Sequence, residues 1–185
     1  MIEKKLLLII DPQIDFISGS LAVGGATDSM IELSKYVATH ANEYSMIAIT
    51  QDWHPIDHCS FKEQGGIWPS HCVAKTEGSE VFQPILDAIT LPTTFLHKGD
   101  VRDKEEYSVM DSEKSSKILI DIINILRPKE IDVCGIALDY CVLESVKGLI
   151  NKGITNINLL SDFTPSIGDK EQTLEKFKKL GINIV

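Results

Sequence analysis

The sequence predicts an α/β protein, a three-layer α/β/α sandwich built on a mainly parallel six-stranded sheet. Two observations lead to this fold class. Short runs rich in Ile, Val and Leu lack the polar alternation of a half-exposed strand, as expected for strands covered on both faces. These runs alternate with longer amphipathic stretches along the 185 residues, and such alternation is typical of parallel strands joined by helical crossovers. The length fits a single domain, residues 1–185.

Six segments have the composition of strands. They are Lys5–Asp11, Met46–Gln51, Thr93–His97, Glu130–Ile136, Asn156–Ser161 and Ile182–Val185. Four segments have the spacing of amphipathic helices, and each is followed by a turn or break such as Arg127-Pro128. They are Asp28–Asn42, Ser112–Leu126, Val142–Asn151 and Lys170–Leu180.

Residues 52–90 interrupt this alternation. The segment holds three of the five histidines and both tryptophans, and it predicts only one short helix near Val81–Ala88. Long irregular segments inside compact domains are usually functional. We therefore expect this segment to contribute to a binding or catalytic site.

Charge and composition exclude several classes of partner. The chain has 18 Lys and Arg against 27 Asp and Glu, a formal net charge of −9. Without a basic face it is not expected to bind nucleic acid, and no apolar segment approaches the roughly 20 residues that a membrane span requires. The four cysteines show no disulfide-framework spacing and the N-terminus lacks the pattern of a signal peptide, so we expect a cytoplasmic protein. The sequence is compatible with a homo-oligomer.

The octapeptide Gly135–Val142 places Cys141 where a buried strand ends and a helix begins. Unpaired N–H groups and the positive end of the helix dipole favour a thiolate there. The same groups would stabilise negative charge on a bound carbonyl oxygen. A cysteine that only packs in the core is the alternative interpretation.

Three other reactive side chains lie at the ends of predicted strands: Asp11, Asp52 and Lys98. In open α/β sheets, ligands bind beyond the carboxyl ends of the strands, so these groups should meet Cys141 at one edge. Asp11 could then take the thiol proton and Lys98 could hold the charges in place. Taken singly, Asp11 is also typical of a turn cap, and Lys98 of a surface lysine.

A second group of side chains has the chemistry of a metal site. Asp52 and His54 are two residues apart at a strand end and should point to one side, and a loop could bring His71 to them. Two imidazoles and a carboxylate suit a divalent metal ion such as zinc, iron(II) or manganese. A fourth contact from His58, Ser60 or water stays open, as does the alternative of ordinary loop histidines.

Aromatic residues near these groups are candidates for contact with a flat substrate. Phe16 and Trp68 could stack on a ring, although core packing is an equally good interpretation of each. His40 and His97 are interpreted as structural.

Several spaced motifs, in order, resemble those of one known family. The resemblance covers nearly the whole chain and is to the nicotinamidase/pyrazinamidase branch of the isochorismatase-like cysteine hydrolases. The motifs are Asp11-x3-Asp15-Phe16, Gly19-x-Leu21-Ala22-Val23, Asp52-Trp53-His54-Pro55, Trp68-Pro69-x-His71-Cys72, Lys98-Gly99, Tyr107-Ser108 and Gly135–Val142.

The resemblance implies an isochorismatase-like, Rossmann-like fold and a role for each group. It implies a triad of Asp11, Lys98 and Cys141, and one divalent metal ion, expected to be zinc, on Asp52, His54 and His71. It also implies an oxyanion hole from the N–H groups of Ala137 and Cys141, beside a cis peptide bond between Ile136 and Ala137. Phe16, Trp68 and Tyr107 would form the substrate pocket.

The activity implied is hydrolysis of nicotinamide, and of pyrazinamide, through a thioester intermediate, within NAD salvage. The chain departs from many relatives at Val109-Met110, where they have Gly-Phe, which leaves the pocket wall near Tyr107 open. Alternatives are an amidase of the ureidoacrylate or N-carbamoylsarcosine type, a non-catalytic binding relative, and a redox sensor based on Cys141.

Overall fold

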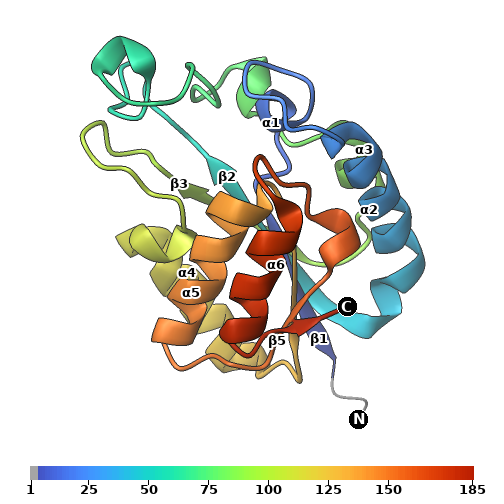
Figure 1. The fold of residues 1–185 in the computed structure, drawn as a ribbon. Coiled ribbons are helices and arrows are strands. Elements are labelled where there is room, and N and C mark those ends of the chain that lie inside the picture. Colours follow the sequence, from blue (N-terminus) through green and yellow to red (C-terminus); the bar gives the residue numbers. More distant parts are fainter. Residues whose placement is uncertain (1–3) are drawn as a thin grey trace.

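The computed structural model describes residues 4–185, which form one six-stranded sheet with strand order β3-β2-β1-β4-β5-β6 (Figure 1). All five strand pairings are parallel. The strands are β1 Lys5–Ile10, β2 Tyr44–Asp52, β3 Thr93–Lys98, β4 Ile131–Gly135, β5 Ile157–Leu159 and β6 Asn183–Ile184. Each lies within or beside a segment expected from the sequence, and the predicted fold class is confirmed.

Helices cover both faces of the sheet (Figure 1). They are α1 Ile14–Ile17, α2 Ala26–His40, α3 Gln83–Ala88, α4 Glu113–Leu126, α5 Leu143–Asn151 and α6 Lys170–Lys179. Buried side chains of α1, α2 and α3 pack in one hydrophobic cluster, and those of α4, α5 and α6 pack in another.

Strand β1 lies at the centre of the sheet and contributes to both clusters. Leu6, Leu8 and Ile10 face the layer of α4, α5 and α6, whereas Leu7 and Ile9 face the opposite layer. Successive side chains of a strand point to opposite faces, so a strand covered on both sides is apolar throughout. All five are completely buried.

Most element boundaries differ by one or a few residues from those expected, and three of these differences affect the site. Strand β2 begins at Tyr44 and includes Asp52, and β3 includes Lys98. Cys141 does not directly precede a helix, because a wide helical turn, Leu138–Val142, stands between β4 and α5. The sequence gives no separate pattern for this turn, since its apolar residues continue the spacing of the helix.

The strand order reverses between β1 and β4, which are neighbours at the centre of the sheet. Ligands of open α/β sheets bind beyond the carboxyl ends of the strands at such a switch point. The backbones of β1 and β4 come close here because Gly135, at the end of β4, has a φ of +117° and no side chain. A Cβ atom at this position would overlap the carbonyl oxygen of Ile10.

No helix within residues 4–185 combines the length and the apolar character needed to cross a membrane.

Gly135→Ala should lower the free energy of unfolding by about 4 kcal/mol, because it adds both backbone strain and a clash with β1. Gly153→Ala is the matched control, since Gly153 has a φ of +82° but nothing within 4 Å of an added Cβ. It should cost only about 1 kcal/mol. Urea unfolding of the two variants measures both values, and equal losses would mean that contact with Ile10 is unimportant.

Candidate active site

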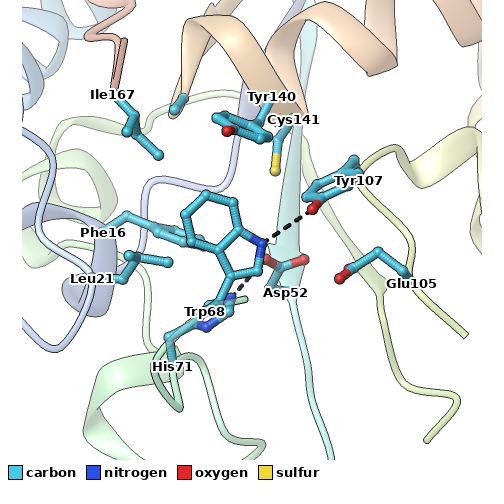
Figure 2. Close-up of a pocket in the computed structure, with 11 residues that line it drawn as sticks. Phe16, Leu21, Asp52, Trp68, His71, Glu105, Tyr107, Tyr140, Cys141 and Ile167 are labelled. Carbon is cyan, nitrogen blue, oxygen red and sulfur yellow. Dashed lines mark hydrogen bonds and ion pairs between the residues drawn. The ribbon is translucent and has the colours of Figure 1, made fainter. Parts of the chain in front are cut away.

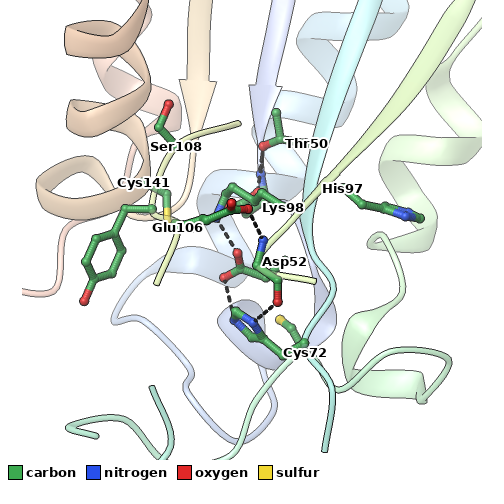
Figure 3. A network of polar contacts seen from close by, with 12 residues as sticks. Thr50, Asp52, Cys72, His97, Lys98, Glu106, Ser108 and Cys141 are labelled. Atoms are coloured by element: carbon green, nitrogen blue, oxygen red, sulfur yellow. Dashed lines mark hydrogen bonds and ion pairs between the residues drawn. The ribbon is translucent and has the colours of Figure 1, made fainter. Parts of the chain in front are cut away.

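The side chain of Lys98 lies at the centre of a buried polar cluster at the carboxyl edge of the sheet (Figure 3). Its Nζ lies 2.9 Å from Oδ2 of Asp11 and 3.5 Å from Sγ of Cys141, and it also donates to Oδ1 of Asp52. Oxygen and sulfur atoms of Asp11, Asp52 and Cys141 all lie within 4.8 Å of one another. The strand ends thus bring together the three residues expected to form a triad.

Local structure fixes the Asp11 carboxylate. Asp11 has a φ of +45°, a left-handed conformation uncommon for a non-glycine residue, and Pro12 follows it. Thr50, on the neighbouring strand β2, donates from Oγ1 to Oδ1 of Asp11 over 2.6 Å. One carboxylate oxygen is therefore held by Thr50, and the other faces Lys98.

The backbone of Asp52 is held by the buried side chain of Gln13. The Gln13 amide donates to the Asp52 carbonyl over 2.8 Å, and its oxygen accepts from the Asp52 N–H over 2.8 Å. The same Nε2 also donates to the carbonyl of Ser79. The Asp52 carboxylate consequently projects from a rigid strand end.

Burial and charge act in opposite directions on the ionisable groups of the cluster. Burial raises the pKa of Asp11, and Lys98 only partly offsets this. Burial also favours a neutral Asp52, but Lys98 and the two histidines outweigh it and lower the pKa of Asp52. Despite its burial Lys98 has a raised pKa, because Asp11 and Asp52 stabilise the ammonium ion.

The thiol of Cys141 does not have the low pKa expected from its position before a helix. Burial raises its pKa well above the usual range, and Asp11 and Asp52 add to this rise although Lys98 opposes it. One ammonium ion already faces two carboxyl groups, so a thiolate would add a further negative charge. The raised pKa therefore favours the protonated thiol over the thiolate at this position.

Asp52, His54 and His71 form a second cluster that shares Asp52 with the first. Oδ2 of Asp52 lies 3.5 Å from Nε2 of His54 and 3.9 Å from Nε2 of His71. The bridge between His54 and Val73 holds the two ends of the intervening loop together. The loop thus brings His71 to His54, as expected from the sequence.

The outer nitrogens of both histidines are engaged by backbone carbonyls. Nδ1 of His54 pairs with the Gly99 carbonyl over 2.9 Å, and Nδ1 of His71 pairs with the Pro69 carbonyl over 2.8 Å. Because a carbonyl can only accept, each Nδ1 carries a hydrogen, and Nε2 is the nitrogen that each ring turns towards Asp52. Metal-binding histidines have this arrangement, and two imidazoles with a carboxylate suit a divalent cation. The residues present therefore fit a metal ion.

His58 packs against this cluster, but both of its ring nitrogens already have hydrogen-bond partners. Its ring stacks on that of His54, with centroids 4.1 Å apart. Nδ1 pairs with Oγ of Ser60 over 2.7 Å, and Nε2 with the Lys104 carbonyl over 3.0 Å. The two side chains named as candidates for a fourth metal contact are thus hydrogen-bonded to each other.

Gly99 and Glu106 connect the two clusters. A Cβ atom at Gly99 would overlap the His54 ring, so this position requires glycine. The carboxylate of Glu106 is buried and accepts a hydrogen bond from the Gly99 N–H over 2.8 Å. The backbone carbonyl oxygen of Glu106 lies 3.4 Å from Nζ of Lys98.

The segment before Cys141 has the features that the resemblance implies for an oxyanion hole. The peptide bond between Ile136 and Ala137 is cis. The Ala137 carbonyl accepts from the N–H groups of Tyr140 and Val142, while within residues 4–185 the Ala137 N–H has no backbone acceptor. Ala137 and Cys141 both line the pocket described next.

An apolar pocket opens above these clusters (Figure 2). Trp68 donates from Nε1 to Oη of Tyr107 over 3.1 Å, and Tyr140 packs edge-on against Trp68 with ring centroids 5.0 Å apart. The pocket thus contains all three expected wall residues. The lining residues are Phe16, Leu21, Asp52, Trp68, His71, Glu105, Tyr107, Ala137, Tyr140, Cys141 and Ile167.

The departure at Val109-Met110 lies behind the pocket rather than in its wall. Neither residue lines the pocket. Val109 is buried in the core, and Met110 packs against Gly148 of α5, where an added Cβ would come within 2.6 Å of the Met110 Cβ. His40 and His97 also lie outside the two clusters: His40 stacks on Tyr36, and His97 on Trp53.

The sequence interpretation missed residues that position the site. Thr50, on β2, and Gln13, which follows β1, act through contacts between distant parts of the chain, and Glu106 acts through a loop. The available indication for Thr50 was that it is a polar residue directly after the apolar run Met46–Ile49. A further pocket residue, Tyr140, belongs to the octapeptide but was assigned no role.

The fold and this site together define an enzyme of the α/β class with a buried thiol at the carboxyl edge of a parallel sheet. The chain belongs to the isochorismatase family, because the model of the isochorismatase domain matches residues 5–184. It is 30% identical to a nicotinamidase/pyrazinamidase of Mycobacterium tuberculosis, with 98% of each chain covered.

Solved structures give the same result. The pyrazinamidase of Pyrococcus horikoshii in complex with zinc has a TM-score of 0.86 and 32% identity, with 98% of each chain covered. The yeast nicotinamidase Pnc1p bound to the inhibitor nicotinaldehyde has a TM-score of 0.87 and 26% identity, with 98% of this chain and 99% of that chain covered.

His71→Ala should weaken binding of zinc by at least about 100-fold, because it would remove one of the three side chains that converge on the candidate metal site. Competition with a chromogenic chelator measures the affinity. His40→Ala is the matched control, since His40 lies on α2 outside the cluster, and it should bind zinc as the unaltered protein does. Equal affinities of the two variants would exclude His71 as a ligand.

Proposed function

We propose that the protein is a nicotinamidase, which hydrolyses nicotinamide to nicotinate and ammonia and also accepts pyrazinamide. The observation that carries this proposal is the position of Cys141, whose sulfur is next to Lys98 and faces an aromatic-walled pocket. The named activity of relatives that cover the whole chain supports the same reaction. Formation of nicotinate would place the protein in NAD salvage.

The first half of the reaction makes a thioester. Asp11 takes the proton of the Cys141 thiol, and the sulfur attacks the carboxamide carbon of the substrate. The N–H groups of Ala137 and Cys141 donate hydrogen bonds to the carbonyl oxygen as negative charge develops on it. Protonated Asp11 then gives its proton to the amide nitrogen, the C–N bond breaks and ammonia leaves.

The second half restores the enzyme. Asp11, again a carboxylate, removes a proton from a water molecule as that water attacks the thioester carbon. The C–S bond breaks, nicotinate is released, and the proton returns from Asp11 to the sulfur. Throughout both halves Lys98 keeps the charges of Asp11 and Asp52 balanced, which explains why this ammonium ion is buried among them.

We assign the metal site to Asp52, His54 and His71, and zinc to the metal. The nitrogen and oxygen donors suit zinc, and the Pyrococcus horikoshii relative is described as a complex with zinc. A bound metal ion would supply a positive charge for the pyridine nitrogen of the substrate, and thereby orientation of the ring. Phe16, Trp68 and Tyr107 would hold the two faces and the edge of that ring.

Cys141→Ala should abolish release of ammonia from nicotinamide while leaving the fold intact, because no other thiol faces the pocket among residues 4–185. Cys59→Ala is the matched control: Cys59 is partly exposed and lies outside the pocket, so its loss should change turnover by less than about twofold. A coupled assay for ammonia measures both, and circular dichroism checks the fold.

Turnover of nicotinamide by the Cys141→Ala variant would refute the nucleophile. Faster turnover of ureidoacrylate or N-carbamoylsarcosine than of nicotinamide by the unaltered protein would instead refute the substrate.

Removal of the metal ion should raise the KM for nicotinamide more than it lowers kcat for residual turnover, because the ion would mainly hold the ring. The comparison is made with benzamide, which has no ring nitrogen and should be affected much less. Steady-state kinetics before and after dialysis against a chelator, with zinc added back, provides the measurement. Equal losses for both substrates would contradict a role in ring binding.

A further inference from the structure

One wall of the pocket comes from a loop that is far from the reactive groups in sequence. Ile167, between β5 and α6, lines the same pocket as Cys141 although its side chain is 45% exposed. Figure 2 shows it across the pocket from Glu105, near Phe16 and Leu21. Its branched apolar side chain therefore faces the space that a substrate ring would occupy.

The loop is fastened to the turn that carries the nucleophile. The carboxylate of Asp139, two residues before Cys141, accepts from the N–H of Ile167 over 3.1 Å and from the N–H of Gly168 over 2.7 Å. The N–H of Leu138 donates to the Pro165 carbonyl over 2.9 Å. Three hydrogen bonds thus join residues 165–168 to residues 138 and 139.

The fastening depends on close approach at Gly168. A Cβ atom there would lie 3.1 Å from Oδ2 of Asp139, so a side chain at this position would press on the carboxylate. Asp139 itself touches neither the pocket nor the cluster around Lys98. The Asp139 carboxylate contacts the backbone of Ile167 and Gly168, so it can affect the pocket only through the position of this loop.

We propose that Ile167 is a specificity-determining residue of the nicotinamidase reaction and that Asp139 is the positioning residue that holds it in place. The inference rests on the proposed function and adds a selection rule to it: the pocket accepts flat nitrogen heteroaromatic carboxamides that carry no substituent on the edge facing Ile167. The catalytic groups alone would not impose this rule.

The chemistry of nicotinamide identifies that edge. The carboxamide on ring carbon 3 must reach Cys141, and the ring nitrogen is assigned to the side of Asp52 and His71. Carbon 5 is meta to both of these anchors and is therefore the ring position most distant from them. A methyl group on carbon 5 tests the remaining walls of the pocket, of which Ile167 is one.

The experiment compares nicotinamide with 5-methylnicotinamide in steady-state kinetics. For Ile167→Ala, the KM for nicotinamide should rise about tenfold with kcat within about threefold, because the side chain touches the ring but no reacting atom. The preference for nicotinamide over 5-methylnicotinamide, as a ratio of kcat/KM values, should fall by about tenfold or more. Ile125→Ala is the matched control, since Ile125 is exposed on α4 far from the pocket lining, and should leave both unchanged.

Asp139→Asn should lower the preference in the same direction, because an amide cannot accept from both N–H groups. Asp162→Asn is its control, an exposed aspartate on the preceding segment. In the double variant Asp139→Asn/Ile167→Ala, the preference should equal that of Ile167→Ala alone, since a residue acting only through Ile167 has no further effect. If the Asp139→Asn variant is unfolded at the assay temperature, Gly168→Ala is used in its place, because its added Cβ would press on the Asp139 carboxylate.

Two results would overturn the inference: an unchanged preference in Ile167→Ala, or additive effects in the double variant. A merely structural role for the loop would lower kcat/KM for both substrates equally and leave the preference as it was. If the unaltered protein does not hydrolyse nicotinamide at all, the proposed function fails and takes this inference with it. Turnover of nicotinamide with an unchanged preference refutes the inference alone.

Discussion

The buried ammonium ion of Lys98 is the constraint on which the rest of the site depends. It touches Asp11, Asp52 and Cys141, which come from three different strands or strand ends. Two carboxyl groups could not be buried together without a positive partner, because the penalty for burying an unpaired charge is several kcal/mol. In turn the lysine is stable there only because both carboxylates surround it. Lys98, Asp11 and Asp52 are therefore each needed for the burial of the others.

Asp52 extends this constraint to the second cluster. One of its oxygens pairs with Lys98 and the other faces both histidines. The proposed metal ion and the ammonium ion would thus share one carboxylate, that of Asp52. A single side chain therefore connects the proposed metal site to the cluster around Cys141.

Much of this arrangement could be predicted from the sequence. Apolar strand patterns located Asp11, Asp52 and Lys98 at strand ends, and parallel topology then requires them to share an edge. The sequence could not show the environment of Cys141: its raised pKa follows from burial and from the neighbouring carboxyl groups of Asp11 and Asp52. The wide turn before α5 also had no separate pattern in the sequence. Gln13 and Thr50 were missed because their partners, Asp52 and Asp11, each lie 39 residues away in the sequence.

The origins of the pocket walls have a consequence for how such a protein can diversify. The reactive groups project from the sheet and its immediate continuation, whereas Trp68, Glu105, Tyr107 and Ile167 come from connecting segments. Loops tolerate insertion and replacement far better than strands buried on both faces. Mutations that reshape the mouth of the cavity can therefore accumulate without disturbing bond cleavage, so that new substrates can be acquired while the chemical steps are inherited unchanged.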